Sequence, residues 1–115
     1  MSKDKKFSSG QEPLIVANRI DTVYDFVNSF AVADATTNYD LDTQQTDAFK
    51  NVPKAWLIII WTDQDVTIRF NSTSNPAIAV PADESPFEFK DIIAVTNIYI
   101  TNASGSTANI KVMLV

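Results

Sequence analysis

The sequence closes with two β-branched stretches joined by a short polar turn: residues 92–101 (IIAVTNIYIT), 102–106 (NASGS) and 107–115 (TANIKVMLV). Apolar and polar side chains alternate along both stretches, as they do on strands with one face on a core. The turn contains Gly105, and its length of about five residues is common in hairpin loops. We therefore predict that the two stretches form an antiparallel hairpin that closes an all-β domain.

The most apolar stretch of the chain, residues 55–62 (AWLIIIWT), comes before this hairpin. Simple alternation divides its large side chains into two sets, Trp56, Ile58 and Ile60 on one face and Leu57, Ile59 and Trp61 on the other. A strand that is apolar on both faces must be covered on both. One face would pack on the core, and a loop, the N-terminal arm or another subunit would cover the second.

Similar alternation predicts further strands. Val66, Ile68 and Phe70 would point inward from one, and Phe87 and Phe89 from another. Residues 14–20 (LIVANRI) form a first predicted strand, and residues 38–42 a half-exposed one through Tyr39 and Leu41.

Residues 22–32 fit either a strand or a helix. Their β-branched and aromatic side chains favour a strand with Tyr24, Phe26 and Phe30 on one face. Over the whole chain Val, Ile and Thr total 33 residues against 4 Leu, a bias that decides for sheet over helix.

Composition excludes several kinds of chemistry. The chain has no cysteine and no histidine, so disulfides, zinc–thiolate sites and Ser-His-Asp or Cys-His catalysis are impossible. Its net charge is −5, and an acidic body repels the phosphates of nucleic acids. The longest apolar run, residues 55–61, is too short to span a membrane. The start has no apolar core, so we expect a protein made in the cytoplasm without a signal peptide.

Residues 1–12 are polar and carry three lysines, with Phe7 as the one large apolar side chain. Such a segment buries too little surface to offset its ordering entropy by itself. Two interpretations remain open: a frayed terminus, or an arm that orders against a neighbouring subunit with Phe7 as its anchor.

Three clusters invite a chemical interpretation. The Asn38, Asp40 and Asp42 spacing resembles the start of a calcium loop, but Thr43 and Phe49 stand where an EF-hand needs Gly and Glu. Two interpretations of these residues remain open, a weak calcium site and a solvated strand face. The closely spaced carboxylates of residues 63–65 indicate a turn, because two residues apart in a tight turn both side chains point into water. The tyrosines and tryptophans could stack on a sugar, but alternation places Trp56 and Trp61 on opposite faces.

The last forty residues, PAIAVPADESPFEFKDIIAVTNIYITNASGSTANIKVMLV, resemble the ends of small β-sandwich virion proteins of tailed bacteriophages. The similarity lies in an IYITN-type strand, an SG turn and an ANIKV-type last strand, and it extends over roughly residues 55–115. The resemblance implies a capsid- or tail-associated structural protein, often displayed on the particle as a homo-oligomer. It brings no catalytic residues with it.

We therefore expect an all-β fold: a single antiparallel, jelly-roll-like β-sandwich of eight or nine short strands over residues 13–115, with an extended N-terminal arm over residues 1–12. The expected function is that of a non-enzymatic capsid decoration or minor capsid protein in the virion. Its expected partners are itself, as a trimer, and the major capsid or another virion protein, without cofactor, metal, nucleic acid or membrane. The alternative is a carbohydrate- or receptor-binding module of a tail or fibre. The candidate interface residues are Phe7, Trp56, Leu57, Ile59, Trp61 and Tyr99.

Overall fold

The computed structural model describes residues 23–115, with Asp91 and Ile92 described by their backbone alone. The arm predicted over residues 1–12, including Phe7, and the strand predicted over residues 14–20 lie outside the described residues. The described strands are β2 (Asp25–Val32), β3 (Thr36–Asp40), β4 (Ala55–Thr62), β5 (Val66–Phe70), β6 (Ile78–Val80), β7 (Phe87–Val95), β8 (Ile98–Asn102) and β9 (Ala108–Leu114). Two short helical segments complete this part of the chain, α2 (Leu41–Gln44) and η1 (Ala82–Glu84).

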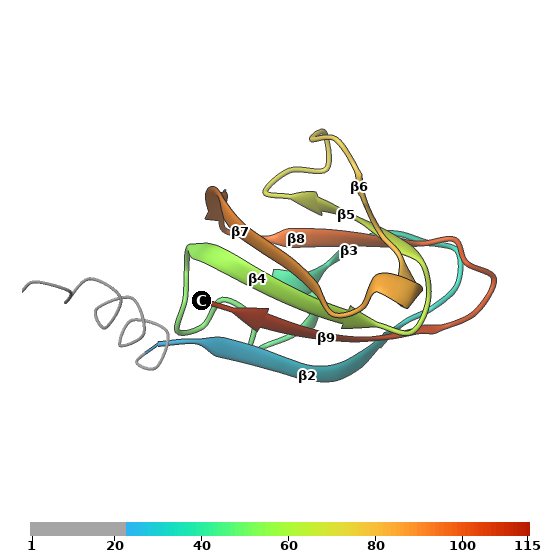
Figure 1. Cartoon of the computed structure of the whole chain (residues 1–115), viewed down its shortest axis with the longest axis horizontal. Helices are drawn as coiled ribbons and strands as arrows, with labels where there is room; N and C mark the ends of the chain where they lie inside the picture. The colour runs from blue at the N-terminus through green and yellow to red at the C-terminus, as the bar shows by residue number, and fades with distance from the viewer. Residues whose placement is uncertain (1–22) are drawn as a thin grey trace, which may run out of the picture.

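The strands form two four-stranded antiparallel sheets packed face to face, with the orders β2-β9-β4-β7 and β3-β8-β5-β6 (Figure 1). The pairs β2–β9, β3–β8, β4–β7 and β5–β6 are nested in the sequence. The described chain is thus one long hairpin with its tip at β5–β6, wrapped into two layers. This is the topology of a jelly roll, and the predicted all-β sandwich is confirmed.

The predicted closing hairpin is wrong. Residues 92–101 are not one strand, because β7 ends at Val95 and β8 begins at Ile98 in the opposite sheet. β9 returns to the first sheet, so the turn after Asn102 crosses between the layers. The break is stabilised by Asn71, whose side chain donates to the Ala94 carbonyl at 3.0 Å and accepts from the Thr96 amide at 2.7 Å.

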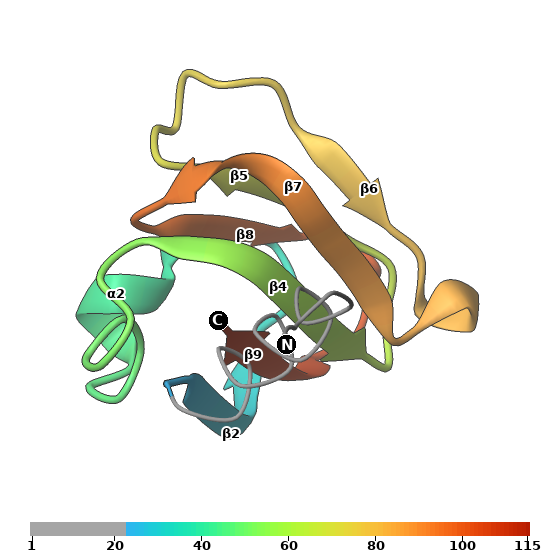
Figure 2. The same ribbon diagram turned by 60° about the vertical axis from the view of Figure 1, so that its left-hand side comes forward.

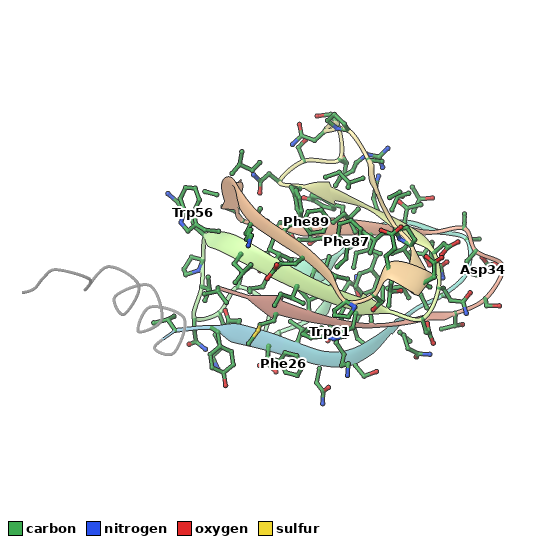
Figure 3. All side chains as sticks on the ribbon, in the orientation of Figure 1. Phe26, Asp34, Trp56, Trp61, Phe87 and Phe89 are labelled. Atoms are coloured by element: carbon green, nitrogen blue, oxygen red, sulfur yellow. The ribbon has the colours of Figure 1, made fainter. Side chains whose placement is uncertain are left out.

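The core lies between the two sheets, where alternate side chains of each strand are buried. The predicted inward residues Val66, Ile68 and Phe70 are buried, as are Ile98 and Ile100. Phe87 and Phe89 are partly buried against the core, and Figure 3 shows both between the layers. Period-two alternation therefore predicted the faces of β5 and β8 and these two positions of β7.

β-Bulges overturn the predicted faces on two strands. In β4 the amides of Trp56 and Leu57 both donate to the Val115 carbonyl, at 2.8 and 3.1 Å. Two consecutive donors on one acceptor form a bulge, so Trp56 is 50% exposed while Ile58 is buried. The prediction that Trp56 shares the face of Ile58 and Ile60 is therefore wrong.

The second bulge lies in β2, where the register with β9 shifts between Val27 and Phe30. Phe30 consequently turns into the core beside Val27, while Tyr24 and Phe26 stay exposed. The prediction that Phe30 shares their face is wrong for this reason, although the choice of strand over helix is confirmed.

The strand predicted over residues 38–42 ends two residues early, at Asp40. Asp40 caps α2 by accepting a hydrogen bond from the Thr43 amide at 3.1 Å, which satisfies a free donor at the start of the helical turn. Leu41 is fully buried as the first residue of α2. The hydrogen bond that caps α2 therefore ends the strand, and the alternation of apolar and polar residues gives no sign of such a cap.

Candidate interaction surface

The sheet β2-β9-β4-β7 is apolar on its outer side as well as on its core side. Leu57, Ile59 and Trp61 of β4 are only half-buried there. In the strand register Ile59 faces Met113 of β9, and Met113 faces Phe26 of β2. We call these five side chains, Phe26, Leu57, Ile59, Trp61 and Met113, the outer apolar face. Figure 2 shows the four strands that carry or flank it in the order β2, β9, β4, β7.

Aromatic contacts give part of this face a defined geometry. The rings of Phe26 and Trp61 pack edge to face with their centroids 6.1 Å apart, an arrangement that aromatic pairs favour. The ammonium nitrogen of Lys111 lies 5.8 Å from the Trp61 ring centroid, within the range of a cation–π contact. Phe26 is nevertheless 41% exposed. The two rings thus have a defined arrangement, and Phe26 is exposed enough to contact a partner.

Opposite charges border the outer apolar face on the edge strand β7. Glu88 pairs with Ile59 and Lys90 pairs with Leu57 in the register of β4 and β7. Both charged side chains are exposed. Because they are two residues apart on one strand, they project to the same side of the sheet. The face is therefore a set of apolar rows, two of which end in charges of opposite sign.

The candidate interface residues do not form one surface. Leu57, Ile59 and Trp61 lie together on the outer apolar face, and the exposed Trp56 precedes Leu57 at the start of β4, at the opposite end of the strand from Trp61 (Figure 3). Tyr99 belongs to β8 in the other sheet, where it pairs with Asp40 and Arg69. Phe7 lies outside the described residues.

Sequence reasoning omitted Phe26 and Met113 from the interface. Each alternates with buried neighbours on its own strand, which is the signal of an outward side chain. Only the sheet order β2-β9-β4 shows that these outward side chains adjoin those of β4. The sequence could therefore have identified each side chain as outward, but not their neighbourhood.

Trp56 forms part of a second feature, a pocket of about 270 Å³ at the end of the sandwich. Val23, Val52, Pro53 and Val115 supply apolar walls, while Asn51 and Lys54 supply polar groups. The pocket is separate from the outer apolar face, because none of its lining residues belongs to that face.

A groove of about 500 Å³ lies between the β4–β5 turn, β6 and the connection after β8. The carboxylates of Asp63 and Asp65, which line this groove, both accept hydrogen bonds from backbone amides. Asp63 accepts from the Asn109 amide at 2.7 Å and from its side-chain nitrogen at 2.9 Å, and these bonds lower the pKa of Asp63. Asp65 accepts from the Ala82 amide at 2.8 Å. Both carboxylates therefore stabilise turns, as predicted.

The acidic stretch around Asp40 is likewise structural. The Asn97 side chain donates to Asp40 at 2.8 Å, and this bond, followed by that from the Thr43 amide, lowers the pKa of Asp40. Among the described residues, no three acidic side chains gather as ligands for a metal. Asp40 thus functions as a helix cap in this structure.

Comparison with protein-family models and with curated proteins finds no match to this chain. Within the part of the chain that the structure describes, no helix has the length and hydropathy required to cross a membrane.

Proposed function

We propose that this chain is a non-enzymatic structural protein of a bacteriophage particle, a capsid decoration or minor capsid protein that self-associates. The outer apolar face carries this proposal, because a solvated sheet normally alternates between an apolar core side and a polar outer side. An exposed apolar patch on a rigid domain marks an interaction surface.

Two further observations support a structural role. The jelly roll recurs in viral capsid domains and in lectins, which agrees with the resemblance of the C-terminal half to phage virion proteins. The carboxylates of Asp25, Asp34, Asp40, Asp63 and Asp65 all accept hydrogen bonds from backbone amides. These side chains stabilise turns of the backbone, which is consistent with a structural role.

In this proposal the outer apolar face contacts another copy, and residues 1–12 reach a neighbouring subunit or the major capsid protein. The protein then resides in the virion after synthesis in the host cytoplasm. A trimer is the assembly expected from the sequence, whereas the outer apolar face itself fits a two-fold contact.

The test is gradient purification of the phage particles whose genome encodes this chain, followed by quantitative mass spectrometry. We expect many copies on each particle, and fewer after Phe26→Ser, which removes an exposed ring from the outer apolar face. Tyr99→Ser is the matched control, because Tyr99 is a half-buried aromatic residue of β8, in the other sheet. Purified particles that lack the protein would contradict the proposal.

The second candidate is a carbohydrate-binding module, and the pocket at Trp56 favours it. A half-exposed indole in a pocket that Asn51 and Lys54 also line combines a stacking surface with polar residues. A glycan array tests this function. Saturable binding that Trp56→Ala abolishes and Phe26→Ser preserves would favour the module, and no binding to any glycan would reject it.

A further inference from the structure

The charges beside the outer apolar face favour one orientation of a partner over another. Two neighbouring rows of the β2-β9-β4-β7 sheet end in opposite charges on β7, one pairing Leu57 with Lys90 and the next pairing Ile59 with Glu88. Both rows begin with a branched aliphatic side chain on β4 and end with an exposed charge. Over β4 and β7 the two rows therefore differ mainly in the sign of that charge.

This pattern is self-complementary under a two-fold rotation. An axis in the plane of the contact, perpendicular to the strands and midway between the two rows, exchanges one row for the other. Leu57 of one copy then meets Ile59 of the second, and Glu88 of each copy meets Lys90 of the other. An isologous contact of this kind repeats every favourable interaction twice.

We infer that the partner of the outer apolar face is a second copy of this chain, related by this two-fold axis, with reciprocal Glu88–Lys90 pairs between the copies. The inference rests on the proposed self-association and names its partner and symmetry. It gives a dimeric contact in place of the trimer expected from the sequence.

The alternative two-fold axis, parallel to the strands, is less favourable. Placed between β9 and β4, it would exchange these two strands and would also exchange β7 with β2. Glu88 of one copy would then lie against Phe26 of the other, since both belong to the row through Ile59 and Met113. A carboxylate placed against an aromatic ring loses water without gaining an opposite charge. The charges thus discriminate between two orientations that apolar contacts alone would allow.

The size of the face sets the expected strength. Four strands spaced about 4.8 Å apart make a face roughly 20 Å wide, and a similar height gives on the order of 400 Å² for each copy, half the ~800 Å² of a standard interface. Free dimers should therefore dissociate in the micromolar range. The high local concentration on a particle would favour the contact much more strongly.

The experiment is a charge exchange on the full chain, with the dissociation constant measured by sedimentation equilibrium over a range of concentrations. Glu88→Lys and Lys90→Glu each place like charges together at both reciprocal contacts. Each should weaken the dimer about 10-fold or more. The double variant, Glu88→Lys with Lys90→Glu, restores opposite charges and should return the dissociation constant to the wild-type value.

Glu84→Lys is the matched control, since it makes the same change of charge at an exposed position on η1, away from the face. Glu84→Lys should leave the dimer unchanged. Glu88 and Lys90 are both exposed, so the variants should fold, and circular dichroism of each checks this. Raised salt should also weaken the wild-type dimer, because exposed ion pairs are screened.

The outcomes separate this inference from the proposed function. If the wild-type protein forms a trimer, or if the double variant is as weak as the single variants, the two-fold pairing is overturned while self-association stands. A wild-type protein that stays monomeric at every concentration would also overturn the inference. Presence on purified particles would still support the structural role in each of these cases.

Discussion

Asn102 offers the sharpest test of how the two layers are joined, because it is fully buried and its side-chain amide makes three hydrogen bonds at the crossing after β8. Its nitrogen donates to the carbonyl of Val32 at 2.9 Å and to that of Ser106 at 2.8 Å. Its oxygen accepts from the Ser104 amide at 3.1 Å. One side chain thereby connects the end of β2 in one sheet with β8 and the turn that leads to β9.

Replacing Asn102 with Ala should lower the free energy of unfolding by about 3 kcal/mol. Most of this loss comes from the buried Val32 carbonyl, since an unsatisfied buried group costs about 1–3 kcal/mol, and the bonds to the more exposed turn contribute about 1 kcal/mol each. A domain of this size should then melt about 10–20 °C lower.

The decisive comparison is Asn102→Asp, which keeps the shape but places a carboxylate oxygen against two carbonyl oxygens. It should destabilise the protein more than Asn102→Ala does at neutral pH, because the buried carboxylate oxygen that replaces the amide nitrogen faces two carbonyl oxygens and has no donor. Urea unfolding followed by circular dichroism at one fixed protein concentration measures both variants. Thr107→Ala, at an exposed position near the same turn, is the control. If Asn102→Asp proves more stable than Asn102→Ala, the donor role assigned to this amide is wrong.

Three further predictions concern the turns. Asp25 is buried and accepts a hydrogen bond from the Val52 amide at 2.8 Å. Asp25→Ala should therefore lower the free energy of unfolding, measured in urea, by about 2–4 kcal/mol. A loss below about 0.5 kcal/mol, typical of surface sites, would contradict this. Because the Asn97 side chain lowers the pKa of Asp40 below its ordinary 3.8, the ionised group stabilises the fold above that pH and loses this contribution as the pH falls through the lowered value. The urea midpoints of wild type and Asp40→Asn should therefore differ at neutral pH and converge in strong acid, and an equal gap at both would refute the effect. Gly105 has φ +95° with no heavy atom within 4 Å of an added Cβ, so Gly105→Ala should cost about 1–2 kcal/mol from the backbone alone, and an unchanged midpoint would contradict it.

Much of the fold class followed from local chemistry. Residues such as Val66, Ile68 and Phe70 alternate with polar neighbours, and their burial in the core is as predicted. Alternation succeeds here because the side chains of a regular strand must point to opposite sides whatever lies next to it. The absence of cysteine and histidine likewise restricts the possible chemistry, because no thiolate or imidazole group exists anywhere in the chain.

Bulges limited the same reasoning on β2 and β4. Trp56 faces away from the core because its amide and that of Leu57 share the carbonyl of Val115, nearly sixty residues later in the chain. Phe30 turns inward because β2 shifts its register against β9. In both cases a distant strand decides which way a side chain points, and no pattern within the strand itself contains that information.

The sequence by itself determined that the chain forms strands and, along regular stretches, which of their side chains are apolar and point inward. Tertiary structure alone decided which strands are neighbours. The closing stretches show the difference: β8 and β9 alternate like the arms of a hairpin, yet they lie in opposite sheets. A period of two is the same for strands that pair within one sheet and for strands that face each other across a core. The outer apolar face exists only because wrapping a long hairpin into a jelly roll placed Phe26, Ile59 and Met113 in one row.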